Sequence, residues 1–273
     1  MRKVILLDNG SSRAQSTLAL RRLAASLEGR IGAPVQPVSL LHADKVAPEL
    51  LDGRGADILE PFLRGQAAEG GRAFLILPLF FGPSRALSAF IPEMIAGIGS
   101  DTGPLDVQIA DVLYPLPDGE ALLVDILADN LRKVVQERNF SMRHVVLVDH
   151  GSPIPEVTAV RRDLAGRLRE RLGSGVRVEE AVMERRRGSE YDFNGDLLEE
   201  VLRRAARSGA GPDLALSMLF LSAGRHAGVD GDVERICRAV ESEFPPFRVH
   251  STPLVGSHPK IIDILQSRYE QSL

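Results

Sequence analysis

An internal repeat dominates this sequence of 273 residues. Residues 4–11 (VILLDNGS) return 141 positions later as residues 145–152 (VVLVDHGS). Residues 79–86 (LFFGPSRA) return 140 positions later as residues 219–226 (LFLSAGRH). Two segments that lie far apart in each copy thus keep almost the same separation. We therefore predict two homologous lobes, an N-terminal one over residues 1–140 and a C-terminal one over residues 141–273.

Short apolar runs alternate with longer amphipathic stretches in both copies, which is typical of β-α units on a parallel sheet. The predicted strands cover residues 3–8, 34–41, 73–80, 106–113, 144–149, 176–183, 213–221 and 247–251. The predicted helices cover residues 13–29, 53–69, 85–97, 119–138, 154–172, 192–209, 229–243 and 259–271. The pattern predicts an α/β fold with two lobes, each a four-stranded parallel sheet flanked by helices, and a cleft between them.

The two copies differ at two positions that bear on chemistry. The C-terminal copy has His150 and His226 where the N-terminal copy has Asn9 and Ala86. Both histidines follow predicted parallel strands, and ligands gather at the carboxyl ends of such strands, so we expect the two side chains to face each other. Neutral imidazoles bind divalent first-row metals and also accept protons. Each histidine alone could be an ordinary loop residue, but their joint presence in one copy favours a shared role.

Two carboxylates near these histidines have open interpretations. Glu184 follows the second strand of the C-terminal lobe and is either a further catalytic group or a solvated residue before the basic run 185–187. Asp149 precedes His150 and either orients the site or is structural, since its counterpart Asp8 has no histidine to orient. His42 and Asp44 are weaker candidates at the same kind of strand end. The remaining histidines are predicted to be structural; they are His144, His250 and His258.

Basic residues gather near the same strand ends. Arg185 and Arg225 are the candidates for binding an anionic ligand, because planar guanidinium groups suit carboxylates. Gly151 and Ser152 open a predicted helix, whose backbone N–H groups could add anion-binding donors. A run of arginines is otherwise usually a solvated surface.

The composition excludes several classes of function. A net charge of −4 gives no general attraction to nucleic acid or anionic membranes. A single cysteine, Cys237, allows neither a disulfide framework nor a cysteine zinc site. No signal peptide or apolar run of bilayer length is visible, so a cytoplasmic protein is expected. The sequence lacks a GxxxxGK[ST] loop, a GxGxxG fingerprint after the first strand and a GxSxG elbow, so nucleotide-driven chemistry is not expected.

The segments VDHGS (148–152) and LFLSAGRH (219–226) together resemble the paired signatures of the sirohydrochlorin cobaltochelatases and ferrochelatases, the CbiX-like class II chelatases. The resemblance extends over both halves and describes a long, two-lobed form. Three features depart from the family pattern. Pro153 stands where a basic residue is common, the N-terminal lobe lacks the histidine pair, and the histidines lie in the second half.

The resemblance implies a lyase that inserts Co²⁺ or Fe²⁺, with Ni²⁺ as a further candidate, into sirohydrochlorin without ATP. This reaction belongs to cobalamin or siroheme biosynthesis. The family pattern makes His150 and His226 the metal-binding and catalytic pair, with Glu184 as an assisting group. The partner is then an anionic tetrapyrrole, and the protein is expected to be a monomer or a homodimer. The alternative is a carrier that binds a metal or a tetrapyrrole in the same cleft without turnover.

Overall fold

The computed structural model describes residues 2–209 and 211–273. The chain divides into two compact units. The first comprises the residues up to Asp118 together with Ile262–Leu273, and the second comprises Gly119–Ile261.

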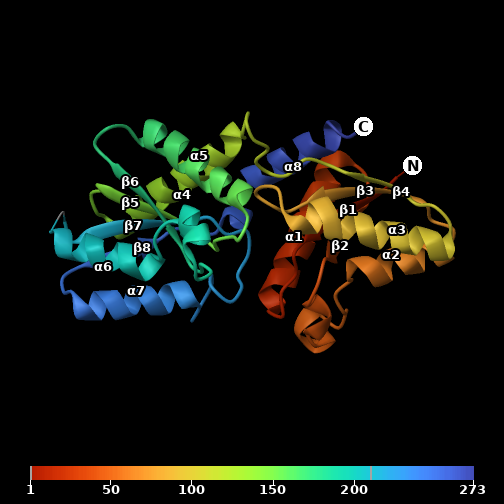
Figure 1. The fold of residues 1–273 in the computed structure, drawn as a ribbon, viewed down its shortest axis with the longest axis horizontal. Coiled ribbons are helices and arrows are strands. Elements are labelled where there is room, and N and C mark those ends of the chain that lie inside the picture. The colour runs from red at the N-terminus through yellow and green to blue at the C-terminus, as the bar shows by residue number, and fades with distance from the viewer. Residues whose placement is uncertain (1, 210) are drawn as a thin grey trace. The chain divides into compact units, whose positions relative to one another are not determined.

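The first unit is built on a parallel four-stranded sheet in the order β2-β1-β3-β4. Helices α2 and α3 cover one face of this sheet, and α1 and α8 cover the other (Figure 1). Its strands are β1 (Lys3–Asp8), β2 (Val35–Ser39), β3 (Ala73–Pro78) and β4 (Asp106–Ile109), and its helices are α1 (Ala14–Ile31), α2 (Leu59–Ala68), α3 (Ile91–Thr102) and α8 (Lys260–Glu270). A π-helical segment, Ala86–Phe90, leads into α3.

The second unit repeats this plan with a parallel sheet in the order β6-β5-β7-β8. Helices α4 and α5 pack together on one face, and α6 and α7 pack on the other (Figure 1). Its strands are β5 (His144–Asp149), β6 (Arg177–Val182), β7 (Asp213–Met218) and β8 (Arg248–Ser251), and its helices are α4 (Ala121–Arg138), α5 (Pro155–Leu172), α6 (Leu198–Ser208) and α7 (Asp232–Glu243).

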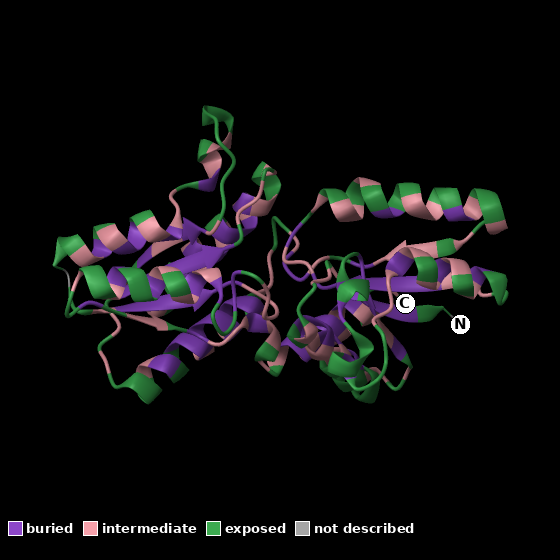
Figure 2. Ribbon diagram, turned by 90° about the horizontal axis from the view of Figure 1, so that it is seen from below, coloured by how far each residue is buried: buried purple, intermediate pink, exposed green. Residues whose placement is uncertain are grey.

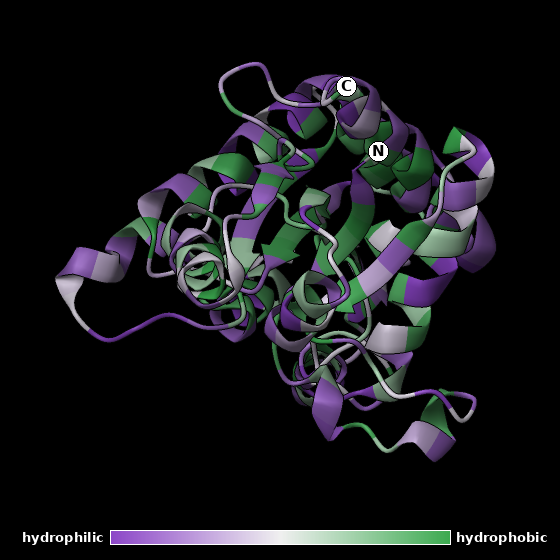
Figure 3. Cartoon of the chain, turned by 90° about the vertical axis from the view of Figure 1, so that its right-hand side faces the viewer, coloured by the Kyte–Doolittle hydropathy of each residue, from purple (hydrophilic) through white to green (hydrophobic). Residues whose placement is uncertain are grey.

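The central strands of both units are largely apolar between their ends, because helices cover both faces of each sheet. All six residues of β5 are buried, as are the apolar residues of β7. Figure 2 shows the sheets as the buried centre of each unit, and Figure 3 shows the same strands as largely hydrophobic while the helices alternate between polar and apolar residues. The predicted fold class, two units of four parallel strands flanked by helices, is confirmed.

The division into units differs from the predicted lobes, because two helices change places. Helix α4 packs on α5 and on the strands β7 and β8, although it precedes residue 140. Helix α8 packs on the first unit, where the Arg268 guanidinium donates to the carbonyl oxygens of Val112 (2.9 Å) and Leu113 (3.3 Å). Each unit is therefore completed by a helix from the other copy of the repeat. The exchange is possible because α4 and α8 are both amphipathic and can each cover a sheet.

Two predicted helices begin later than expected. The helix predicted over residues 192–209 is α6, which begins at Leu198 after a separate 3-10 helix over Ser189–Asn194. The sequence favoured a helix over residues 53–69, yet α2 begins only at Leu59. Gly53 has a positive φ of 79°, and the Ser39 amide donates to the Asp57 carbonyl oxygen, which keeps residues 57–58 extended beside β2. Among the described residues, no helix is long and apolar enough to cross a lipid bilayer.

Candidate metal centre

The turn after β5 places His150 directly beside Glu184. The chain after β6 continues alongside this turn, with Met183 and Glu184 donating their amides to the carbonyl oxygens of Asp149 and His150, both at 3.0 Å. Gly151 permits this approach: its φ is 86°, and a Cβ atom there would lie 2.1 Å from the Glu184 carbonyl oxygen. Only glycine adopts this conformation at little cost and leaves that space empty.

The loop after β7 brings His226 to the same place from the other side of β5. The His226 carbonyl oxygen accepts the Val233 amide, which fixes this loop on the first turn of α7. The His226 ring is almost fully buried. Its centroid lies 4.7 Å from that of His150, with the two ring planes inclined at 72°. The structure thus brings together two side chains that are 76 positions apart in the sequence.

Three side chains converge here as potential metal ligands. One ligand atom from each of His150, Glu184 and His226 lies within 4.8 Å of the others. Ligand atoms around one first-row ion are about 2 Å from it, so these three can meet on a single ion through small side-chain rotations. Two imidazoles and one carboxylate form a mixed N/O set, which suits iron, cobalt, nickel or zinc.

Neighbouring groups fix the orientation of both rings. His226 Nδ1 lies 2.8 Å from Asp232 Oδ2, and its Nε2 lies 3.4 Å from Glu184 Oε1. His150 Nδ1 lies 3.1 Å from the Gly151 carbonyl oxygen, which leaves Nε2 for a ligand. An imidazole bound to a metal usually has its second nitrogen held in this way.

Burial and the nearby His150 ring lower the pKa of His226, and the carboxylates of Glu184 and Asp232 oppose this shift. The lowered pKa favours the neutral imidazole, which is the form that binds metals and accepts protons. Asp232 also contacts Arg235 and lies 3.5 Å from Arg225. Sequence reasoning missed Asp232, because an acidic residue at the start of a helix is a common pattern that carries no signal of its own.

The predicted anion-binding arginines differ in how strongly they are engaged. Arg225 is 76% exposed and lies 3.6 Å from Glu184 and 3.5 Å from Asp232. Arg185 donates to the Gly195 carbonyl oxygen at 3.1 Å and lies 3.5 Å from Asp192. Arg225 therefore stands at the edge of the metal centre, and Arg185 is tied to the loop that follows β6.

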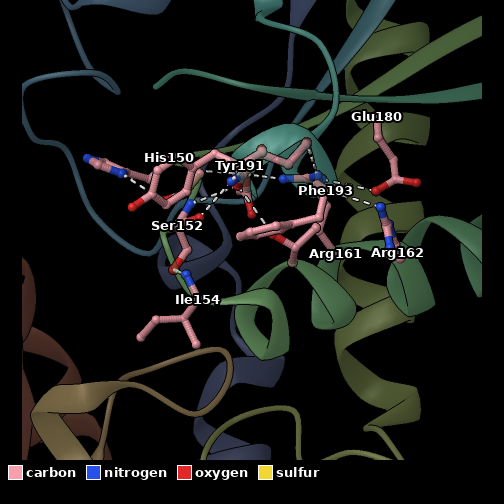
Figure 4. Close-up of polar contacts among 12 residues, drawn as sticks. His150, Ser152, Ile154, Arg161, Arg162, Glu180, Tyr191 and Phe193 are labelled. Carbon is pink, nitrogen blue, oxygen red and sulfur yellow. Dashed lines mark hydrogen bonds and ion pairs between the residues drawn. The ribbon is translucent and has the colours of Figure 1, made fainter. Parts of the chain in front are cut away.

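The predicted backbone donors are occupied within the turn. The Gly151 amide donates to the Asp149 carboxylate, the Ser152 amide to Asn194 Oδ1, and the Ile154 amide to Ser152 Oγ. Gly151 and Ser152 thus shape the turn itself, as Figure 4 shows for His150, Ser152 and Ile154. Contact of either residue with a bound anion stays a prediction.

The other histidines make separate contacts within their own units. His144 contacts Glu179 (3.0 Å) at the start of β5, and His250 contacts Asp213 (2.7 Å). His258 lies 3.7 Å from Asp129. His42 adjoins a short 3-10 helix that contains Asp44, with its Nδ1 3.5 Å from the Lys45 ammonium.

The first unit has the same backbone arrangement without the ligands. The Leu41 amide donates to the Asn9 carbonyl oxygen, just as the Glu184 amide donates to that of His150. Leu41 is therefore the counterpart of Glu184. With Ala86 in the repeated position of His226, the three ligand positions of the second unit are occupied in the first by Asn9, Leu41 and Ala86, none of which is an imidazole or a carboxylate.

Comparisons with known proteins agree with this arrangement. A model of the CbiX family matches residues 144–272. The chain is similar in structure to SirB from Bacillus subtilis with Fe³⁺, at 16% identity and a TM-score of 0.71, over 100% of this chain and 96% of that one.

Two further solved structures are similar over almost their whole length. The sirohydrochlorin chelatase SirB from Bacillus subtilis subspecies spizizenii in complex with cobalt is 18% identical, with a TM-score of 0.63 over 100% of this chain and 95% of that one. CbiX, described as the terminal enzyme for biosynthesis of siroheme in denitrifying bacteria, is 18% identical with a TM-score of 0.63 over 100% of both chains. At these identities the likeness establishes a common fold. No curated protein matched the sequence.

Proposed function

We propose that this protein is a chelatase that inserts a divalent metal into sirohydrochlorin. The match of the CbiX family model to residues 144–272 and the likeness of the fold to the SirB and CbiX structures support this proposal. The observation that carries the proposal is the convergence of His150, Glu184 and His226 on one point. The enzyme would be a lyase that needs no nucleotide.

The metal substrate first binds to the two imidazoles and the Glu184 carboxylate. A tetrapyrrole accepts a divalent ion only when its two pyrrole N–H protons leave. As the ion moves from the protein to the ring nitrogens, His226 Nε2 and the Glu184 carboxylate, 3.4 Å apart, become free to accept these two protons and pass them to water. Asp232 keeps the His226 ring in place through Nδ1 and stabilises its protonated form.

The carboxylate groups of the substrate require positive partners. Arg225 lies beside the metal ligands and is 76% exposed. Arg187 is exposed and forms no ion pair or hydrogen bond with the described residues. Arg185 keeps part of its guanidinium for loop contacts. We propose that Arg225 and Arg187 bind substrate carboxylates more directly than Arg185.

The proposed metal is Co²⁺ or Fe²⁺, and the product enters cobalamin or siroheme biosynthesis. SirB has been solved with Fe³⁺ and with cobalt, which supports a first-row metal. Mixed imidazole and carboxylate ligands do not by themselves select one ion, so Ni²⁺ belongs in the same assay.

The test follows the visible spectrum of sirohydrochlorin mixed with protein and Co²⁺, Fe²⁺ or Ni²⁺. We expect His150→Ala and His226→Ala each to lower the insertion rate about 100-fold or more, with unchanged circular dichroism. His258→Gln is the matched control, because His258 lies outside the centre, and it should retain the parent rate.

Two results would contradict the proposal. Insertion by His150→Ala or His226→Ala at the parent rate would exclude the proposed ligand set. Binding of metal or ring by the parent protein without faster insertion would identify a carrier in place of an enzyme.

A further inference from the structure

Arg161 of α5 is an arginine whose side chain lies inside the protein, 2% exposed. Each of its three nitrogens donates a hydrogen bond to a different segment. Nη1 contacts Asp149 Oδ1 (2.7 Å), Nε contacts Glu180 Oε2 (3.0 Å), and Nη2 contacts the Asn194 carbonyl oxygen (2.6 Å). One side chain thereby joins the end of β5, strand β6 and the loop that precedes α6.

Two of these three contacts lead toward the metal centre, those with Asp149 and Asn194. Asp149 immediately precedes His150, and the same Asp149 Oδ1 accepts the Gly151 amide at 3.0 Å. Asn194 is 1% exposed. Its Oδ1 accepts the Ser152 amide at 3.0 Å, and its Nδ2 donates to the Ser152 carbonyl oxygen at 2.7 Å. The turn that carries His150 is thus held on both sides by groups that Arg161 contacts (Figure 4).

The corresponding turn of the first unit lacks both supporting residues. Helices α1 and α5 begin and end at positions 141 residues apart, which makes the buried Leu20 the counterpart of Arg161. The Ser39 amide donates to the Asp57 carbonyl oxygen, just as the Val182 amide donates to that of Asp196. Asp57 therefore corresponds to Asp196, and two residues earlier Gly55 corresponds to Asn194. Both supporting residues are absent from the copy whose turn carries Asn9 in place of the histidine.

The energetics argue against a role in stability alone. Removing a guanidinium and its carboxylate partners from water is costly, and apolar residues of similar volume often stabilise such a position as well or better. Leu20 demonstrates that an apolar residue fits this place in the fold. The second unit nevertheless has a buried arginine there, next to the histidine.

We propose that Arg161 is a positioning residue, which acts through Asp149 and Asn194 to hold His150 in the orientation that binds the metal. This inference rests on the proposed metal centre of His150, Glu184 and His226. Arg161 touches neither the metal substrate nor the tetrapyrrole in this account.

The experiment measures Co²⁺ binding to the full-length protein by visible absorption, without tetrapyrrole, for five proteins. They are the parent, His150→Ala, Arg161→Leu, Arg161→Lys and Arg171→Leu. Lysine keeps the charge but offers a compact ammonium in place of the three-sided guanidinium. Arg171 lies on the same helix, pairs with Asp125 at 2.8 Å and serves as the matched control. Thermal unfolding followed by circular dichroism sets a temperature at which each variant is folded.

We expect Arg161→Leu and Arg161→Lys to bind Co²⁺ about 10–100-fold more weakly than the parent, and Arg171→Leu to bind like the parent. If Arg161→Leu does not fold, Arg161→Lys decides the result. Parent-like affinity in folded Arg161→Lys, together with weakened binding in His150→Ala, would overturn the positioning role and leave the proposed function standing. Parent-like affinity in His150→Ala would overturn both.

Discussion

Asp8 and Asp149 occupy the same position in the two copies of one turn, yet their surroundings differ. Asp149 pairs with Arg161, which opposes the rise in the Asp149 pKa that burial causes. Asp8 has no such arginine, since Leu20 stands at the matching helix position. Burial raises the pKa of Asp8 from 3.8 to about 6, with a hydrogen bond to Ser39 as the main opposing effect. Burial thus raises the pKa of both carboxyl groups, but only Asp149 has an arginine that opposes the shift.

Asp8→Asn tests this difference through the pH dependence of stability. The raised pKa means that the folded protein favours protonated Asp8, so its contribution is fully present below pH 3.8 and is lost as the pH rises through about 6. The variant, which resembles the protonated acid, lacks this loss. We expect it to become more stable relative to the parent between about pH 4 and pH 7, by up to about 3 kcal/mol.

Urea unfolding at both ends of this pH range measures the effect. The same stability difference between parent and variant at each pH would show that Asp8 titrates normally in the folded protein.

At the scale of elements, the site depends on how closely two strand ends approach. Gly10 and Gly151 have φ values of 82° and 86°, and a Cβ atom would lie 1.7 Å from the Leu41 carbonyl oxygen and 2.1 Å from that of Glu184. The two turns are therefore under the same steric constraint, but only the second carries ligands.

Gly151→Ala and Gly10→Ala form a matched pair. Each should cost about 2–4 kcal/mol in unfolding free energy, because the strand ends must separate and the alanine adopts a left-handed conformation. Gly151→Ala alone should also weaken Co²⁺ binding by at least about 10-fold, since it moves Glu184 away from His150. Equal Co²⁺ affinities in the two folded variants would argue against a ligand set at this turn.

At the scale of the whole molecule, most of α8 belongs to the first unit although it follows the second unit in the sequence. Arg268 is 4% exposed and supports the first unit through the carbonyl oxygens of Val112 and Leu113. Arg268→Ala should lower the unfolding free energy by about 2–4 kcal/mol, because buried carbonyl groups lose their donors. Calorimetry together with Co²⁺ titration tests this. Weakened Co²⁺ binding by folded Arg268→Ala would show that the metal centre depends on the first unit.

The repeat made much of this molecule predictable. It located both sheets and singled out His150 and His226, because the matching segments of the first copy provide an internal comparison. It left the role of Glu184 open, since a glutamate before three arginines fits a solvated surface equally well. Arg161 was missed although Leu20 stands in its place, because one polar residue in an apolar stripe draws attention only when the two helices are aligned.

The exchanged helices escaped prediction for a different reason. The apolar patterns of α4 and α8 predict that each covers a sheet, but do not specify which sheet. That choice depends on contacts such as the hydrogen bond from Asn130 to the Pro253 carbonyl oxygen (3.3 Å), which joins residues 123 positions apart.

A single-turnover experiment tests the central claim most directly. The protein is loaded with one equivalent of Co²⁺, freed of excess metal, and mixed with sirohydrochlorin while the visible spectrum is recorded. The account predicts that about one cobalt-containing ring forms per protein, faster than with the same amount of free Co²⁺. A spectrum of bound, metal-free sirohydrochlorin, or insertion no faster than in free solution, would contradict it.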